Sequence, residues 1–109
     1  MDHLAYTLRL LCQRNRDGSH ATQADRLRVL ILASRHLREA GFRQLRAHSL
    51  NGRHVEVLLK RWQAEGLSAG TLKNRAACLR WWAEKIGKAG MIPTDNTQLA
   101  IPERRFVTN

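Results

Sequence analysis

The sequence is short of acidic residues, and this shortage sets its chemical character. Nine Asp and Glu stand against nineteen Lys and Arg, which gives a formal net charge of +10 in a chain of 109 residues. So much positive charge on a small surface favours a polyanionic partner. Arginine greatly outnumbers lysine, and arginine forks onto phosphates and guanine more specifically than lysine does. An anionic membrane fits less well, because the basic residues are spread over several helical segments instead of one isolated amphipathic helix.

Several signatures of other functions are missing. No apolar run approaches the ~20 residues of a membrane span, and residues 1–18 contain no small-residue cleavage site of a signal peptide. There is no glycine-rich phosphate loop, no HExxH and no GxSxG motif. The five histidines are scattered and meet no zinc spacing. We therefore expect no catalytic centre, no metal and no cofactor.

Cysteines are also few. Cys12 and Cys78 each fall inside a helical pattern, on or beside an apolar stripe. The two could pair, but buried free thiols in a reducing cytoplasm fit this placement better. We therefore expect a cytoplasmic protein.

The apolar residues recur at spacings of three and four in four segments, which predicts four helices. Hydrophobic residues make up 43% of the chain, enough for one core in one domain, and no segment alternates clearly enough for a strand. The fold class expected is all-α, a compact four-helix bundle over residues 1–90. Residues 91–109 contain both prolines and are predicted to be an extended tail or linker. The predicted helices cover residues 2–17, 22–40, 52–65 and 66–87.

Local signals place the ends of these helices. Thr22 and Asp25 form a variant of the capping box, so the second helix should start at Thr22. Asn51 or Ser49 should cap the third helix, and Ser68 the fourth. Glycines should end the helices, for example at position 87. The middle of the second helix, 29–33, is apolar nearly all round, which marks it as the central helix. Phe42, Leu45 and Leu50 should tuck back onto the core from the loop that follows it.

The tryptophans are predicted to have structural roles. Trp62 and Trp82 lie at core spacing, so a core position is expected for both. Trp81 is adjacent to the apolar stripe and could face a partner domain or a DNA sugar.

The fourth helix has a second face rich in polar and basic groups near its start. A helix N-terminus offers free amides and a partial positive charge to an anion. On the second helix, Arg28 and Arg35 are seven residues apart and share a face. The polar and basic groups of the fourth helix are Thr71, Lys73, Asn74, Arg75 and Arg80. The alternative for these groups, and for Arg28 and Arg35, is that they form a solvated surface without a ligand.

An ordered set of motifs resembles a known family. The motifs are Ala-Thr-Gln-Ala-Asp-Arg at 21–26, Leu-Ser-x-x-Thr-x-Lys-Asn-Arg at 67–75, Leu-Arg-Trp-Trp at 79–82 and Ile-Pro-x-Arg-Arg-Phe-Val at 101–107. Together they resemble the N-terminal core-binding domain of phage-type integrases, the tyrosine recombinases of phages, genomic islands and other mobile elements. The similarity covers almost the whole chain.

The resemblance implies a SAM-like four-helix domain that clamps one face of double-stranded DNA at a core or attachment site, in a bacterial cytoplasm. It would place the segment from Thr71 to Arg75, with Arg80, against DNA. The matching motif of the second helix would add Thr22, Gln23 and Arg26. Arg28 and Arg35 are added from their basicity and helix geometry alone.

The chain departs from the family's catalytic pattern. No histidine is followed by arginine at the third position, and the only tyrosine is Tyr6. We therefore expect a non-enzymatic, monomeric DNA-binding part of an integrase, whose partner is a catalytic domain in the same full-length protein. Two alternatives stay open: a helical protein-interaction module whose charge only aids solubility, and an RNA-binding or nonspecific nucleic-acid-binding protein.

Overall fold

A computed structural model of the chain describes residues 3–89, and over these residues the chain forms helices and no strand. The predicted all-α, four-helix bundle is confirmed. The predicted tail, 91–109, and the domain boundary before it lie outside the described residues. The helices are α1 (His3–Arg14), α2 (His20–Glu39), α3 (Gly52–Ala64) and α4 (Ala69–Lys85), with a 3₁₀ turn, η1 (Ala47–Ser49), before α3.

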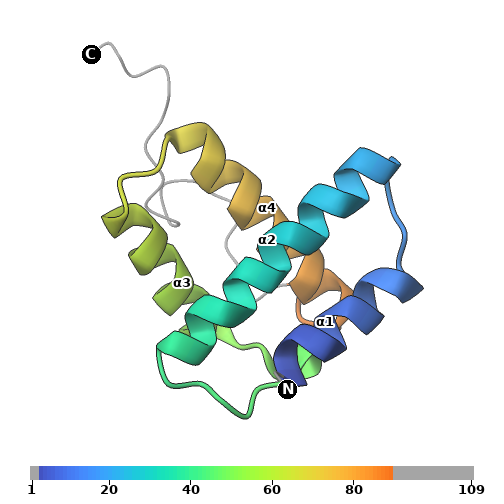
Figure 1. Cartoon of the computed structure of the whole chain (residues 1–109), viewed down its shortest axis with the longest axis horizontal. Coiled ribbons are helices and arrows are strands. Elements are labelled where there is room, and N and C mark those ends of the chain that lie inside the picture. Colours follow the sequence, from blue (N-terminus) through green and yellow to red (C-terminus); the bar gives the residue numbers. More distant parts are fainter. Residues whose placement is uncertain (1–2, 90–109) are drawn as a thin grey trace.

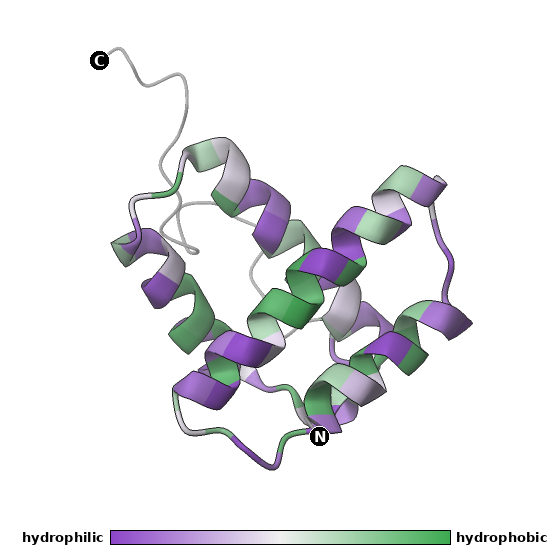
Figure 2. Ribbon diagram, viewed as in Figure 1, coloured by the Kyte–Doolittle hydropathy of each residue, from purple (hydrophilic) through white to green (hydrophobic). Residues whose placement is uncertain are grey.

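Helix α2 is the centre of the bundle, as its apolar middle predicts. It packs against α1, α3 and α4, and Figure 1 shows it crossing in front of α4. Val29, Leu30 and Ala33 have no exposed surface, whereas Ile31 and Leu32 remain half-buried on the outer side. Hydrophobic residues gather in the middle turns of α2, with hydrophilic ones toward both ends (Figure 2). The ends of α2 are therefore free to carry polar chemistry.

Two tryptophans fill the core, as predicted. Trp62 and Trp82 are fully buried, and a buried N–H group needs an acceptor. The indole N–H of Trp82 donates to the carbonyl of Ala47 at 2.7 Å, and that of Trp62 donates to Nδ1 of His36 at 2.9 Å. These bonds fix α4 to η1 and α3 to α2.

The helix starts follow the predicted caps with one exception. Ser68 caps α4 and Asn51 caps α3, as expected. The predicted start of α2 at Thr22 is wrong, because Ser19 has the extended backbone of an N-cap and its hydroxyl accepts a hydrogen bond from the Thr22 amide at 3.1 Å. Asp25, expected to complete the cap at Thr22, points instead to α4.

Glycines end α2 and α4 with the same pair of hydrogen bonds. Gly41 and Gly87 have positive φ angles of 105° and 78°, a conformation that side chains with a Cβ rarely adopt. After α2 the amide of Phe42 donates to the carbonyl of Leu37 at 3.0 Å. After α4 the amide of Lys88 donates to the carbonyl of Ala83 at 2.8 Å. This is the Schellman motif, and it confirms the predicted stop at residue 87.

The loop after α2 is folded onto the core as predicted. Leu45 and Leu50 are buried, and Phe42 is partly buried. The amide of Ala47 donates to the hydroxyl of Thr7 at 2.9 Å, so the loop is tied to α1 as well.

Candidate nucleic-acid interface

The N-terminal parts of α2 and α4 meet at one carboxylate, Asp25. Its Oδ1 lies 2.6 Å from Nη2 of Arg28, and its Oδ2 accepts a hydrogen bond from the Asn74 amide at 3.0 Å. These two bonds, that of Arg28 first, hold the pKa of Asp25 below its usual value. Two predicted DNA contacts from different helices are therefore brought together, and the Arg28 side chain remains 65% exposed.

Arg28 and Arg35 line a hollow on the outer side of α2. The hollow has a volume of about 290 Å³, and half-buried Ile31 and Leu32 line it as well. The structure thus brings the two arginines to one face, as their spacing predicts.

The predicted residues of α4 do not form a single surface. Lys73 and Arg80 are seven positions apart and share a face, which is turned by roughly 100° from the face of Asn74. Thr71 lies in the first turn, where its hydroxyl accepts a hydrogen bond from the Ser68 hydroxyl at 3.0 Å. Asn74 is linked to Arg28 through Asp25, and Thr71, three positions before Asn74, lies about 60° away around the helix.

Arg75 contributes to the wall of the core. Its guanidinium carbon lies 5.1 Å from the ring centre of Trp62, a cation–π distance. Its Nη1, like Nη1 of Arg80, is buried without a hydrogen-bond partner among the described residues. The proposed DNA contacts of these arginines stay predictions, and Arg75 has a structural role besides.

Thr22 and Gln23 stabilise the first turn of α2. The hydroxyl of Thr22 accepts a hydrogen bond from Ser19 at 3.1 Å. The side-chain amide of Gln23 donates to the carbonyls of Arg16 at 3.1 Å and Gly18 at 2.9 Å. Any contact of these two residues with DNA would come in addition to this local role.

Arg26 is held inside a polar joint between the α1–α2 loop and α4. It is only 9% exposed, its Nη1 donates to the carbonyl of Asp17 at 3.1 Å, and its guanidinium lies 4.3 Å from the ring centre of Trp81. The predicted DNA residue Arg26 is therefore largely occupied within the protein.

Asp17 completes this joint. Its Oδ2 lies 2.8 Å from Nζ of Lys85 and accepts the indole N–H of Trp81 at 2.8 Å. The hydrogen bonds from Lys85 and Trp81 lower the pKa of Asp17. Helix α1 ends at Arg14 and not at residue 17 as predicted, which leaves Asp17 in the loop where it reaches α4. Trp81 thus faces the protein's own joint.

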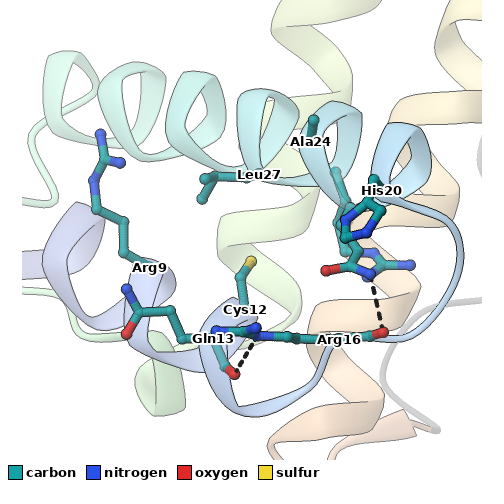
Figure 3. A pocket seen from close by; sticks show the side chains of 9 residues that line it. Arg9, Cys12, Gln13, Arg16, His20, Ala24 and Leu27 are labelled. Atoms are coloured by element: carbon teal, nitrogen blue, oxygen red, sulfur yellow. Dashed lines mark hydrogen bonds between the residues drawn. The ribbon is translucent and has the colours of Figure 1, made fainter.

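A pocket of about 270 Å³ lies between α1 and the start of α2 (Figure 3). Gln23 and Arg26 line it together with three residues that sequence reasoning assigned to no site, Arg9, Arg16 and His20. A signal existed for two of them, because Arg9 and Arg16 have the same seven-residue spacing that singled out the two arginines of α2.

No nucleophile or metal centre is assembled within residues 3–89. No group of three potential metal ligands occurs among them. Cys12 and Cys78 are free thiols, and burial raises the pKa of Cys78 to about 11, which keeps it protonated. No helix in the described part of the chain is long and apolar enough to cross a membrane.

The fold and these surfaces define a class: a small all-α domain with exposed cationic groups on its central helix. A family model described as the N-terminal domain of phage integrases matches residues 1–92. The chain therefore belongs to the phage integrase N-terminal domain family, which confirms the resemblance and links it to DNA integration and recombination. The matched region is the N-terminal SAM-like domain of an integrase and not the catalytic domain. No curated protein and no solved structure matches the chain.

Proposed function

We propose that this domain binds double-stranded DNA at a core recombination half-site of a tyrosine recombinase, and that a catalytic domain of the same protein carries out cleavage and joining. Membership of the integrase N-terminal family and the net charge of +10 support this function. The domain itself supplies affinity and position, and no chemical step.

The observation that carries the proposal is the outer face of α2 beside the start of α4. Arg28 and Arg35 present guanidinium groups there, and Asn74 lies next to Arg28 through Asp25. Guanidinium groups supply phosphate contacts, while an amide can pair with the edge of a base. Thr71, in the first turn of α4, adds a short polar group about 60° around the helix from Asn74.

A salt titration with a matched pair of variants tests the proposal. Fluorescence anisotropy measures binding to a duplex that carries the element's attachment site, at several salt concentrations. The double variant Arg28→Gln/Arg35→Gln should bind at least about tenfold more weakly and with a salt slope shallower by about 2, because each lost phosphate contact removes about 0.9 from the slope. Circular dichroism checks that the variant is folded.

The control is Arg53→Gln/Lys60→Gln, which removes the same charge from exposed positions of α3. It should leave affinity within about twofold of the parent. Equal losses in both variants, or binding that does not respond to salt, would contradict the proposed face.

One alternative loses support from the structure. A protein-interaction module should expose a large apolar patch, but Tyr6 is the only large hydrophobic side chain in residues 3–89 that is exposed. A preference for RNA over the duplex in the same titration would favour the other alternative.

A further inference from the structure

The pocket between α1 and α2 is lined by apolar side chains and by basic ones. Cys12 of α1 and Leu27 of α2 point toward each other across it, and Arg9 reaches from α1 toward α2 (Figure 3). Arg16 and His20 come from the connection and from the first residue of α2. With a volume of about 270 Å³, the pocket has room for a small polyatomic anion.

Arg16 and Arg26 are held in place without any acidic partner. Nε of Arg16 donates to the carbonyl of Gln13 at 3.2 Å, and Arg26 is fixed by a backbone carbonyl and an aromatic ring. No Asp or Glu lines the pocket. The neighbouring carboxylates are already engaged, Asp17 by Lys85 and Asp25 by Arg28. The positive charge of the pocket is therefore not neutralised by the described residues.

The pocket adjoins the proposed DNA face. Ala24 and Leu27, which line it, are one helical turn before Arg28 and Ile31, which border the outer hollow of α2. From Gln23 to Arg35 the cationic surface extends about 18 Å along α2 at the 1.5 Å rise of an α-helix. A duplex carries a phosphate for about every 1.7 Å of its axis, so DNA held at Arg28 and Arg35 brings phosphates near the pocket.

We propose that the pocket binds a phosphate group, namely one phosphodiester of the DNA backbone beside the contacts of α2 and α4. Arginine side chains that line a pocket without any carboxylate can bind the oxygens of a phosphate. The pocket positions the duplex but reads no bases, because a phosphate carries no sequence information. This inference rests on the proposed DNA binding and adds a separate contact point to it.

The first experiment uses inorganic phosphate and the full chain without DNA. ¹H–¹⁵N NMR spectra are recorded with phosphate and with chloride at equal ionic strength. Phosphate should shift the signals of Arg9, Arg16, His20 and Gln23, and the double variant Arg9→Gln/Arg16→Gln should lose these shifts. Shifts spread evenly over all exposed arginines, or none at the pocket, would overturn the proposal.

The second experiment measures duplex affinity. Arg9→Gln/Arg16→Gln should lower affinity several-fold, by the same factor for an attachment-site duplex and a scrambled one, and make the salt slope shallower by about 1. The control Arg43→Gln/Arg53→Gln, which removes the same charge at exposed positions away from the pocket, should bind like the parent.

The outcomes separate the two proposals. If the parent binds the duplex and the pocket variant binds equally well, the phosphate contact is wrong while the proposed function stands. If the parent does not bind duplex DNA, the proposed function fails, and phosphate shifts at the pocket would then assign it to a free phosphate and overturn its role on DNA. Self-association of the parent that the pocket variant abolishes would show that the pocket takes an acidic group of a second copy, and would also overturn the proposal.

Discussion

In the C-terminal half of α3, the basic side chains Lys60 and Arg61 have acidic partners within the chain. Nη1 of Arg61 lies 2.7 Å from Oε1 of Glu39 on α2, and its Nε lies 3.2 Å from Oε2 of Glu65. Nζ of Lys60 lies 3.8 Å from Glu56. The hydrogen bonds that Arg61 donates to Glu39 and Glu65 raise the pKa of Arg61 above its usual value.

On α1, in the α1–α2 connection and on the outer side of α2, most cations near the proposed site have no such partner. Arg9, Arg16 and Arg35 form no ion pair with a described residue, whereas Arg28 is paired with Asp25. The sequence explains the contrast. Glu56 stands four residues before Lys60, and Glu65 stands four residues after Arg61. Helix α2 has acidic residues only near its two ends.

The difference separates two uses of positive charge. Arg61 joins α3 to Glu39 of α2 and to Glu65, and Lys60 pairs with Glu56 one helical turn earlier. These contacts stabilise the fold. Arg9 and Arg35 form no ion pair with a described residue, so a polyanionic partner can neutralise them. Substitutions on α3 should therefore change stability, and those on the outer side of α2 should change binding.

The largest effect on stability is expected from Trp62→Phe at the inner side of α3. The change removes the N–H donor and leaves Nδ1 of buried His36 without a partner, besides creating a small cavity. We expect the free energy of unfolding to fall by about 2–4 kcal/mol. Urea denaturation followed by circular dichroism measures it.

The matched control is Trp81→Phe, which also loses an indole N–H bond, to Asp17. Trp81 is half-buried and Asp17 is exposed, so water can replace the bond and the loss should be smaller. A larger loss for Trp81→Phe than for Trp62→Phe would show that the polar joint at α4, and not the junction of α3 and α2, carries the stability.

Much of the fold could be predicted because its signals are local. The apolar spacing identifies α4 and places Trp62 and Trp82 in the core, and Ser68 marks a helix start. The start of α2 could not be decided in this way, because Ser19 and Thr22 are both good N-caps by residue type. Contacts with distant residues, such as that of Asp25 with α4, lie outside any local pattern.

The site was less predictable for the same reason. Arg26 belongs to a motif and is basic, which favours an exposed contact, but Trp81 covers it and Asp17 fixes it. Asp17 and Trp81 are 64 positions apart in the sequence, so no spacing rule joins them. The pocket likewise depends on how α1 lies against α2.

The junction of α3 and α2 should also respond to pH. Burial, with the charge of Arg61 added, lowers the pKa of His36, and burial lowers the pKa of His54, whose Nδ1 accepts the Asn51 amide. The unfolded chain therefore binds more protons below about pH 6.5, the ordinary histidine pKa. Stability should be complete above that pH and should fall as the pH drops below it, down to the lower pKa of the folded state.

Denaturation midpoints between pH 7.5 and 5 test this dependence. The carboxyl groups with lowered pKa values, such as Asp17 and Asp25, lose their stabilising charge only at lower pH, so this window isolates the histidines. His36→Gln should flatten the profile in part, and the double variant with His54→Gln should flatten it further. A parent whose stability is constant over this range would contradict the neutral, accepting role of both rings.

The smallest effect on stability, and the sharpest test of the contrast, comes from Arg61→Gln compared with Arg35→Gln. Both variants remove one positive charge, so their net charges are equal. Arg61→Gln should reduce stability by no more than about 1 kcal/mol, because ion pairs at the surface contribute little. It should leave the salt slope of DNA binding unchanged, whereas Arg35→Gln should make that slope shallower by about 0.9 and leave stability unchanged. Equal effects of both variants on DNA binding would mean that affinity follows net charge and not the position of the unpaired cations on α2.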